Sequence, residues 1–227
     1  MKPLYIYITR HGQTQHNINE RVQGWNDSPL TDLGIYQAKC TGIGLKDVTF
    51  VKAYSSDLAR QYDTAQTILQ QNNHPDVPII EDIRLREMCY GRFQAGPTIN
   101  MLKPIFDKYN VEFPQYEILK NYITAHQISD FLSHMDSTIE TVDSVQKRML
   151  EALNHIVEDN ADGGNVLVAS SSCAIDDLFH YLFPANQYGW LVDNCCICLL
   201  RYQDGKFYQE AYDDISYRQK GEALCTK

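Results

Sequence analysis

The stretch LYIYITRHGQTQHN, residues 4–17, decides the fold more than any other part of the chain. Its first residues, Leu4 to Thr9, are apolar, aromatic or β-branched, which is typical of a strand buried in a sheet. The charged pair Arg10 and His11 follows at once, with Gly12 behind it. In α/β folds the ligand crevice lies beyond the carboxyl ends of the strands. We therefore expect Arg10 and His11 to stand at that crevice.

The rest of the chain alternates predicted strands with predicted helices. Further strands are expected at Phe50–Tyr54, Val77–Ile80, Asn165–Ser170, Cys196–Arg201 and Lys206–Tyr212. The last two are expected to pair through the turn at Asp204-Gly205. This alternation indicates an α/β fold, a three-layer α/β/α sandwich around a mainly parallel sheet.

Helices are predicted where apolar residues recur at helical spacing. The expected apolar faces are Leu33, Tyr36, Cys40 and Ile43; Leu58, Tyr62, Ala65 and Leu69; and Val142, Val145, Met149, Leu153 and Ile156. The first of these helices should begin near Thr31-Asp32. Ser55, Ser56 or Asp57 is available to cap the second. A short helix is also expected at Ile175–Leu182.

The pattern weakens over residues 92–137, where three prolines interrupt it and aromatic residues are scattered. We interpret this segment as a mostly helical lid insertion over the active site of a single domain, residues 1–227. Its aromatic residues are expected to pack against one another, because aromatic side chains usually belong to a core.

The composition limits the possible classes of function. The chain has 227 residues, of which 44% are hydrophobic and 22% charged, so it can bury a core without disulfides or metals. Its formal net charge of -9 argues against binding to nucleic acid or to an anionic membrane. An anionic metabolite stays possible, because a few arginines can dominate a pocket. No signal peptide is visible, and a cytoplasmic location is predicted.

The seven cysteines have no framework spacing, so reduced thiols are expected. Cys195, Cys196 and Cys198 cluster in an apolar run, and we interpret them as buried strand thiols rather than metal ligands. The histidines other than His11 have no motif context and are interpreted as ordinary. They are His16, His74, His126, His134, His155 and His180.

A series of residues follows Arg10-His11-Gly12 at characteristic intervals. It comprises Asn17, Arg21, Gln23-Gly24, Asp27, Ser55 to Arg60, Glu87, Glu140 and Arg148. The order and spacing of this series closely resemble the histidine phosphatase superfamily, and in particular its phosphoglycerate mutase-like family. The resemblance covers most of the chain and is weakest in residues 92–137.

The resemblance implies a role for each of these residues. His11 would be the nucleophile that accepts the phosphoryl group, and Glu87 the general acid that protonates the leaving group. The phosphate-binding residues it implies are Arg10, Asn17, Arg60 and Ser171, and Arg21, Gln23 and Gly24 would form the rim of the pocket. The chemistry is consistent, because neutral imidazole is a nucleophile and guanidinium groups match phosphate oxygens. No metal and no cofactor enter this scheme.

One departure from the family pattern is informative. After the later strand the family normally has a second histidine, in a pattern such as V-S-H-G, whereas this chain has Ser171 followed by Ser172 and Cys173. Serine donates a hydrogen bond but cannot be cationic. Loss of one preorganised donor typically lowers a rate by ~10²–10³-fold, so impaired turnover is predicted.

A milder departure is Gln94-Ala95, where phosphatase relatives carry Glu-Gly and mutases tend to have Gln-Gly. The paired arginines with which mutases hold a carboxylate are not evident.

The predicted function is therefore a metal-independent phosphomonoesterase of reduced activity that acts on a small phosphorylated metabolite. The first alternative is a non-catalytic member that binds or senses such a metabolite, and a phosphoglycerate mutase is the weaker one.

Overall fold

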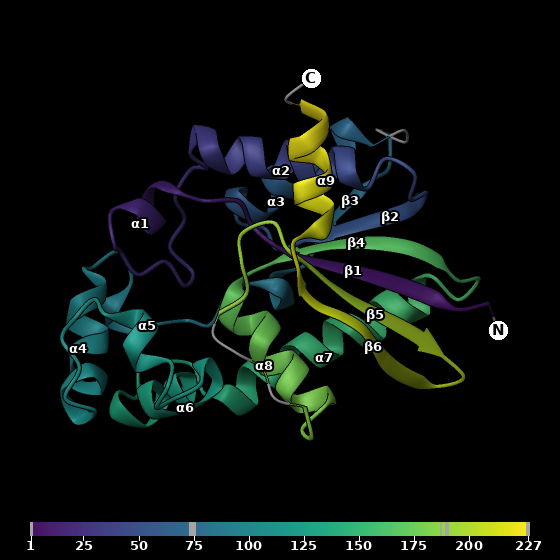
Figure 1. The fold of residues 1–227 in the computed structure, drawn as a ribbon. Coiled ribbons are helices and arrows are strands. Elements are labelled where there is room, and N and C mark those ends of the chain that lie inside the picture. Colours follow the sequence, from purple (N-terminus) through teal and green to yellow (C-terminus); the bar gives the residue numbers. More distant parts are fainter. Residues whose placement is uncertain (1, 73–75, 187, 189–190, 226–227) are drawn as a thin grey trace.

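The computed structural model describes residues 2–72, 76–186, 188 and 191–225. Within these residues, six strands form one mixed sheet in the order β3-β2-β4-β1-β5-β6 (Figure 1). The strands are β1 (Leu4–Arg10), β2 (Phe50–Ser55), β3 (Ile79–Glu81), β4 (Gly164–Ser170), β5 (Ile197–Gln203) and β6 (Lys206–Asp214). The strands β1 to β4 pair in parallel, whereas β5 is antiparallel to β1 and β6 to β5. The predicted α/β class and mainly parallel sheet are confirmed.

Side chains alternate between the two faces of the sheet, and helices cover both. Ile6 and Ile8 of β1 belong to one buried cluster, which includes residues of α7 (Val142–Asp159) and α8 (Ser172–Leu182). Tyr7, between them, belongs to a second cluster. That face is covered by α2 (Asp32–Gly44), α3 (Ala59–Gln71) and α9 (Ser216–Cys225) (Figure 1). The predicted face of α7, from Val142 to Ile156, is buried as expected.

The pairing of the parallel strands builds the site. Arg10 at the end of β1 lies opposite Ser170 at the end of β4, and Ser55 at the end of β2 lies opposite Ala169. The backbone N–H of His11 donates to the carbonyl of Ser170 at 3.1 Å. The residues that follow three parallel strands therefore meet at one edge of the sheet.

The predicted apolar face of α2 is correct for Cys40, which is fully buried, and wrong for Leu33 and Tyr36. Leu33 and Tyr36 are 48% and 41% exposed, and small residues are buried in their place. A Cβ on Gly42 would lie 2.4 Å from the carbonyl oxygen of Ile68 in α3, and one on Gly44 would lie 1.9 Å from that of Tyr217 in α9. Backbones that approach this closely leave no room for large side chains, so the inner face of α2 has small ones.

The predicted cap of α3 is also wrong, because no side chain of Ser55 or Asp57 serves it. Asp27 of a distant loop takes this role, as its Oδ2 accepts from the N–H of Ala59 at 2.6 Å. Ser56 Oγ accepts from the N–H of Leu58 just before the helix. Asp57 instead pairs with Arg86, whose Nε lies 2.7 Å from its Oδ1. A carboxylate at a helix N-terminus is favourable wherever in the sequence it comes from.

Residues 92–137 hold α4 (Thr98–Lys108), α5 (Tyr116–Leu119) and α6 (Ala125–Met135), which lie together beside α8 and away from the sheet (Figure 1). The shorter elements are α1 (Gln15–Ile18), η1 (Ile83–Leu85) and η2 (Gly91–Phe93). The aromatic residues of the segment pack together as expected, with Phe106 edge-on to Phe113 and Tyr116.

Three other expectations concern cysteines, histidines and membranes. Cys195, Cys196 and Cys198 are buried free thiols, as predicted. His74 lies outside the described residues. In the part of the chain that the structure describes, no helix has the length and the apolar character needed to cross a membrane.

Candidate active site

A cavity of about 410 Å³ opens where β1, β2 and β4 end. It is lined by eight of the nine site residues predicted from the sequence: Arg10, His11, Asn17, Arg21, Gln23, Gly24, Arg60 and Glu87. Ser171, the ninth, does not line it. The structure thus brings together residues that lie as far apart as positions 10 and 87 in one concave site.

His11 is fixed in one orientation by its neighbour. Its Nδ1 lies 2.8 Å from the carbonyl oxygen of Gly12, and a carbonyl can only accept, so Nδ1 carries the proton of the neutral ring. The lone pair is then on Nε2. Burial, with the nearby charges of Arg60 and Arg10, holds the pKa of His11 well below its usual value of 6.5. The imidazole is therefore neutral and nucleophilic at neutral pH.

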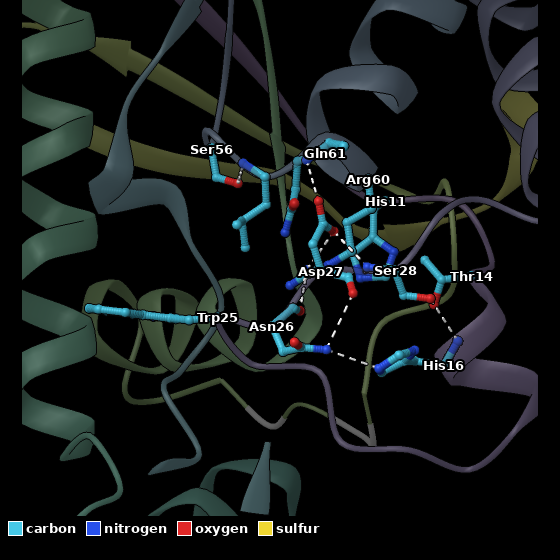
Figure 2. Close-up of polar contacts among 12 residues, drawn as sticks. His11, Thr14, His16, Trp25, Asn26, Asp27, Ser28, Ser56, Arg60 and Gln61 are labelled. Atoms are coloured by element: carbon cyan, nitrogen blue, oxygen red, sulfur yellow. Dashed lines mark hydrogen bonds and ion pairs between the residues drawn. The ribbon is translucent and has the colours of Figure 1, made fainter. Parts of the chain in front are cut away.

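Arg60 is fully buried at the first turn of α3, and loop carbonyls orient it. Its Nη2 donates to the carbonyl of Gly24 at 2.7 Å, and its Nη1 to the carbonyl of Asn26 at 3.0 Å and to Asp27 Oδ1 at 3.1 Å. Figure 2 shows Asp27 near Arg60 and a contact between Asn26 and His16. The other carboxylate oxygen of Asp27 accepts from the N–H of Ala59, the first residue of α3. Asp27 therefore holds the helix and the guanidinium in one geometry.

Arg10 approaches the cavity from the end of β1. Its Nη1 donates to the carbonyl of Val192 at 2.6 Å, and the carbonyl of Arg10 accepts from the N–H of Cys195. The loop before β5 therefore sets the direction of this guanidinium. Two arginines and a neutral imidazole at one end of the cavity form a strong anion site.

Glu87 is buried at the N-terminus of α8. Its Oε1 accepts from the N–H groups of Met88 at 2.8 Å and Ala174 at 2.9 Å. Its Oε2 accepts from the N–H of Cys173 at 3.2 Å and from no other donor in the described part of the chain. The less engaged oxygen, Oε2, is the atom with capacity for a proton.

The loop that carries Glu87 is itself held in place. Arg148 of α7 donates to the carbonyls of Arg86 at 2.6 Å and Glu87 at 3.0 Å, and its Nε pairs with Glu140 at 2.7 Å. Trp25 Nε1 donates to the same Glu87 carbonyl at 2.8 Å. These contacts hold the backbone of the Glu87 loop and do not involve Arg10, His11 or Arg60.

Ser171 is buried and faces away from the cavity, toward α3. Its Oγ lies 2.6 Å from the side-chain amide of Gln61 (Figure 2 shows Gln61 beside Arg60). With the amide oxygen facing Ser171, that oxygen accepts from Ser171 Oγ and from Arg60 Nε, and the amide nitrogen donates to Ser56 Oγ. The hydroxyl is thus used in a buried network. The next two residues, Ser172 and Cys173, line the cavity instead.

The rim residues differ in how they are held. Asn17 forms a capping box with Thr14, the N-cap of α1: its Oδ1 accepts from the N–H of Thr14 at 3.0 Å, and Thr14 Oγ1 accepts from the N–H of Asn17 at 3.2 Å. Arg21 is exposed and donates to the carbonyl of Ala95 at 2.5 Å. Gln94 Oε1 accepts from the N–H of Trp25 at 2.6 Å, so it orders the loop beside Gly24 rather than the cavity. Of the predicted rim residues, Arg21 is therefore held by a backbone carbonyl, whereas the buried Oε1 of Gln23 has no hydrogen-bond partner among the described residues.

The other end of the cavity is apolar. Helices α4, α5 and α6 contribute Thr98, Met101, Leu102, Tyr116, Ala125, Ile128, Ser129 and Leu132 to its lining. None of these side chains is charged. In the described part of the chain, no group of three or more His, Cys, Asp or Glu side chains is arranged to hold a metal ion.

The comparisons with known proteins agree with this geometry. The sequence profile described as the histidine phosphatase superfamily (branch 1) matches residues 6–215. The chain belongs to the histidine phosphatase superfamily. A crystal structure of a phosphoglycerate mutase from Bacillus anthracis is 32% identical and covers 97% of both chains, with a TM-score of 0.87. The Bacillus stearothermophilus protein YhfR is 25% identical, with a TM-score of 0.76 over 95% of this chain and 99% of that one.

Curated superfamily members match over shorter stretches. A 2,3-bisphosphoglycerate-dependent phosphoglycerate mutase of Gloeobacter violaceus is 42% identical over 90 residues, which is 40% of this chain and 41% of that protein. The fructose-2,6-bisphosphatase TIGAR of Xenopus tropicalis is 39% identical over 113 residues, 49% of this chain and 41% of that protein. The matches thus span about two-fifths of these relatives' lengths.

Sequence reasoning missed residues that position the site rather than form it. Asp27 and Arg148 belonged to the motif series, but nothing in their spacing showed that they hold Arg60 and the Glu87 loop. Gln61 gave no signal beyond its place next to Arg60. Cys173 and Tyr90 both line the cavity, where the Tyr90 hydroxyl lies 3.0 Å from Cys173 Sγ.

Proposed function

We propose that the protein is a metal-independent phosphomonoesterase that works through a phosphohistidine at His11 on a small phosphorylated metabolite. The observation that carries this proposal is the state of His11. It is a buried, neutral imidazole with its Nδ1 proton held by Gly12 and with Arg10 and Arg60 beside it. A nucleophile that approaches a dianionic ester needs such neutralising charges.

The proposed reaction has two steps. In the first, His11 Nε2 attacks phosphorus, the bond between phosphorus and the alcohol oxygen breaks, and Glu87 Oε2 gives that oxygen a proton. In the second, water attacks phosphorus, the bond between phosphorus and His11 Nε2 breaks, Glu87 takes a proton from this water, and inorganic phosphate leaves. The first step leaves His11 phosphorylated and Glu87 deprotonated, and the second step restores both groups, so the enzyme is unchanged after the cycle. The arginines hold the phosphoryl oxygens throughout.

The proposed turnover is slow. The family pattern places a histidine where this chain has Ser171, and the hydroxyl of Ser171 bonds to Gln61 instead of lining the cavity. The transition state would therefore lack one donor and one positive charge. Losing a preorganised donor corresponds to ~10²–10³-fold in rate.

The presence of Ser171 in place of the family histidine also supports the second candidate function, which is binding without hydrolysis. A member that binds a phosphorylated metabolite without hydrolysing it needs the anion site but not the missing histidine. The intact Arg10, Arg60 and His11 geometry is compatible with both candidates. A phosphoglycerate mutase is the weakest candidate, because the described lining from residues 92–137 offers no cation for a carboxylate. A cytoplasmic location belongs to the proposal and is supported by the seven free cysteines.

The test is hydrolysis of an aryl phosphate by the purified protein in the presence of a chelator. Wild-type protein should release phosphate, and His11→Ala should lower kcat by at least ~10³-fold, since nucleophile loss in an enzyme has effects of that order or larger. Equal hydrolysis by His11→Ala would overturn the proposed mechanism. Binding of inorganic phosphate without any hydrolysis in the wild type would favour the non-catalytic candidate.

A further inference from the structure

The end of the cavity farther from His11 is walled by uncharged side chains of residues 92–137. Met101 and Leu102 come from α4, Tyr116 from α5, and Ile128 and Leu132 from α6. All but Tyr116 are at most 9% exposed. The polar groups that these helices add to the lining are hydroxyls, those of Thr98 and Ser129 among them.

Residues 92–137 do contain cations, but these are engaged elsewhere. Lys103 pairs with Asp107 at 2.6 Å, with both side chains 59% exposed. The Lys108 ammonium lies 5.2 Å from the centre of the Phe131 ring. Arg92 pairs with Asp136. None of them lines the cavity, so the apolar wall does not result from a lack of charge in this segment.

The wall is also held firmly by packing. The ring of Tyr116 packs edge-on against two others, with its centre 5.4 Å from the ring centre of Phe106 and 5.6 Å from that of Phe113. Burial raises the pKa of the Tyr116 phenol to about 12, so it stays neutral in the physiological range. Edge-on aromatic contacts add stability beyond the area they bury. A ligand therefore meets a prebuilt apolar surface.

We propose that the alcohol part of the substrate is uncharged and apolar. This inference rests on the proposed function, in which the phosphate occupies the Arg10–His11–Arg60 end. Among the described lining residues of the wall, a sugar would find a few hydroxyls and a second phosphate would find no cation, so most of the water they lose would not be replaced, which is unfavourable for polar groups and more so for charges. An apolar alcohol gains on the order of 25 cal/mol per Å² of surface removed from water.

Arg21 is the feature that could favour a second anion, since it lines the cavity and is exposed. Its guanidinium already donates to the carbonyl of Ala95, and it belongs to the loop that follows α1 rather than to the wall. An anionic substrate that depended on Arg21 would therefore contradict the inference, and the experiment includes this outcome.

The experiment compares two phosphate esters of primary alkyl alcohols, so that leaving-group reactivity is similar. 2-Phenylethyl phosphate should have a kcat/KM at least ~30-fold above that of glycerol 1-phosphate, because discrimination by an apolar pocket is of the order of 10–200-fold per well-placed group. Fructose 1,6-bisphosphate should be poorer than both. A preference for either polar ester, and especially one abolished by Arg21→Ala, would overturn the inference.

A matched pair of variants connects the preference to the wall. Ile128→Thr places a hydroxyl in the lining and should lower kcat/KM for 2-phenylethyl phosphate about fivefold, with less than a twofold change for glycerol 1-phosphate. Ile99→Thr makes the same change at a residue of α4 that is 39% exposed and does not line the cavity, and it should change neither value. Equal effects of the two variants would contradict a role for the wall.

A binding measurement separates this inference from the proposed function. His11→Ala should bind 2-phenylethyl phosphate at least tenfold more tightly than glycerol 1-phosphate in calorimetry. If the wild type hydrolyses neither ester but this preference is found, the proposed function fails and the inference on the apolar wall stands. If hydrolysis depends on His11 but the preference is absent, the function stands and the inference fails.

Discussion

The two ends of the cavity are built in different ways. At the anion end, each charged side chain is held by backbone groups: Arg10 by the carbonyl of Val192, Arg60 by that of Gly24, and Glu87 by the N–H groups of α8. At the apolar end, side chains pack against side chains, as Tyr116 does against Phe106. Backbone partners fix the position of a charge closely, whereas apolar packing tolerates exchange of residues of similar volume. We infer that the first end determines the chemistry and the second the choice of substrate.

After His11→Ala, the largest expected effect is that of Arg60→Lys, which changes the anion end of the cavity. Arg60→Lys keeps the charge but cannot donate together to the carbonyls of Gly24 and Asn26 and to a phosphate, because the planar fork is lost. We expect kcat/KM to fall on the order of 10²-fold. Arg201→Lys is the matched control, since Arg201 lies on β5 and pairs with Glu210 away from the cavity. A loss below threefold for Arg60→Lys, in steady-state assays of both variants, would show that the fork is not needed.

The second prediction concerns Ser171. The family pattern has a histidine at this position, but the buried Oγ of Ser171 lies 2.6 Å from the Gln61 side chain, so the imidazole of Ser171→His alone has no room there. The double variant Gln61→Ala/Ser171→His creates that room and should raise kcat about tenfold, whereas Ser171→His alone should show little gain. Gln61→Ala serves as the control for loss of the network. A double variant no faster than the wild type would mean that the imidazole does not reach the phosphoryl group.

The third prediction uses the charges around His11. The neutral ring is the reactive form, and burial, followed by Arg60 and Arg10, lowers its pKa. The loss of kcat/KM on acidification should therefore come well below pH 6.5 in the wild type. Arg60→Gln removes one of the charges, so the pKa of His11 should rise and activity should be lost at a higher pH. Superimposable pH profiles of the two proteins, each normalised to its maximum, would contradict this electrostatic account.

The smallest expected effect concerns the contact between α6, which lines the apolar end of the cavity, and α8, whose N-terminus holds Glu87. His126 of α6 donates through Nδ1 to Asp177 of α8 at 2.8 Å, and this hydrogen bond raises the pKa of His126. A raised folded-state pKa gives stability that is present below about pH 6.5 and lost as the pH rises through the folded value. Burial raises the pKa of Asp177 to about 6, so the pair is ionised near pH 6.5, and His126→Gln should lower the free energy of unfolding by about 0.5 kcal/mol more at pH 6.5 than at pH 8.5.

Urea denaturation at the two pH values checks this prediction. His134→Gln is the control, because His134 lies on the same helix with its side chain 78% exposed. A destabilisation by His126→Gln that is the same at both pH values, or that matches the control, would show that the pair does not link α6 to α8 through its charge.

The sequence predicted that Arg10, His11 and Arg60 lie at one site, and they line one cavity, whereas the contacts of the positioning residues were not predicted. A buried strand followed by Arg10-His11 places those residues at a strand end from local pattern alone, because side-chain periodicity and strand direction are local properties. The partnership of Asp27 with the start of α3 joins residues that lie 32 positions apart, and only the folded chain reveals it. The same holds for Ser171 and Gln61, which lie 110 positions apart.

The error in α2 has a different physical reason. Helical spacing predicted that Leu33 and Tyr36 face the core, yet close approach of α3 and α9 favours glycine and alanine on the inner face. Apolar periodicity identifies a buried helix face from its large apolar residues and does not identify a buried face made of glycine and alanine. The apolar wall could not be predicted either, because the lining of a cavity depends on how α4, α5 and α6 are placed beside α8.

The most direct test of the account is to trap the phosphoryl group on the enzyme. Wild-type protein mixed with excess aryl phosphate, quenched in alkali within milliseconds and digested, should yield a peptide phosphorylated on His11 in mass spectrometry. Phosphohistidine is a nitrogen-linked phosphoramidate, so the label should survive alkali and disappear in acid, and His11→Ala should show none. Release of phosphate without label on His11, or with label on another residue, would contradict the central claim.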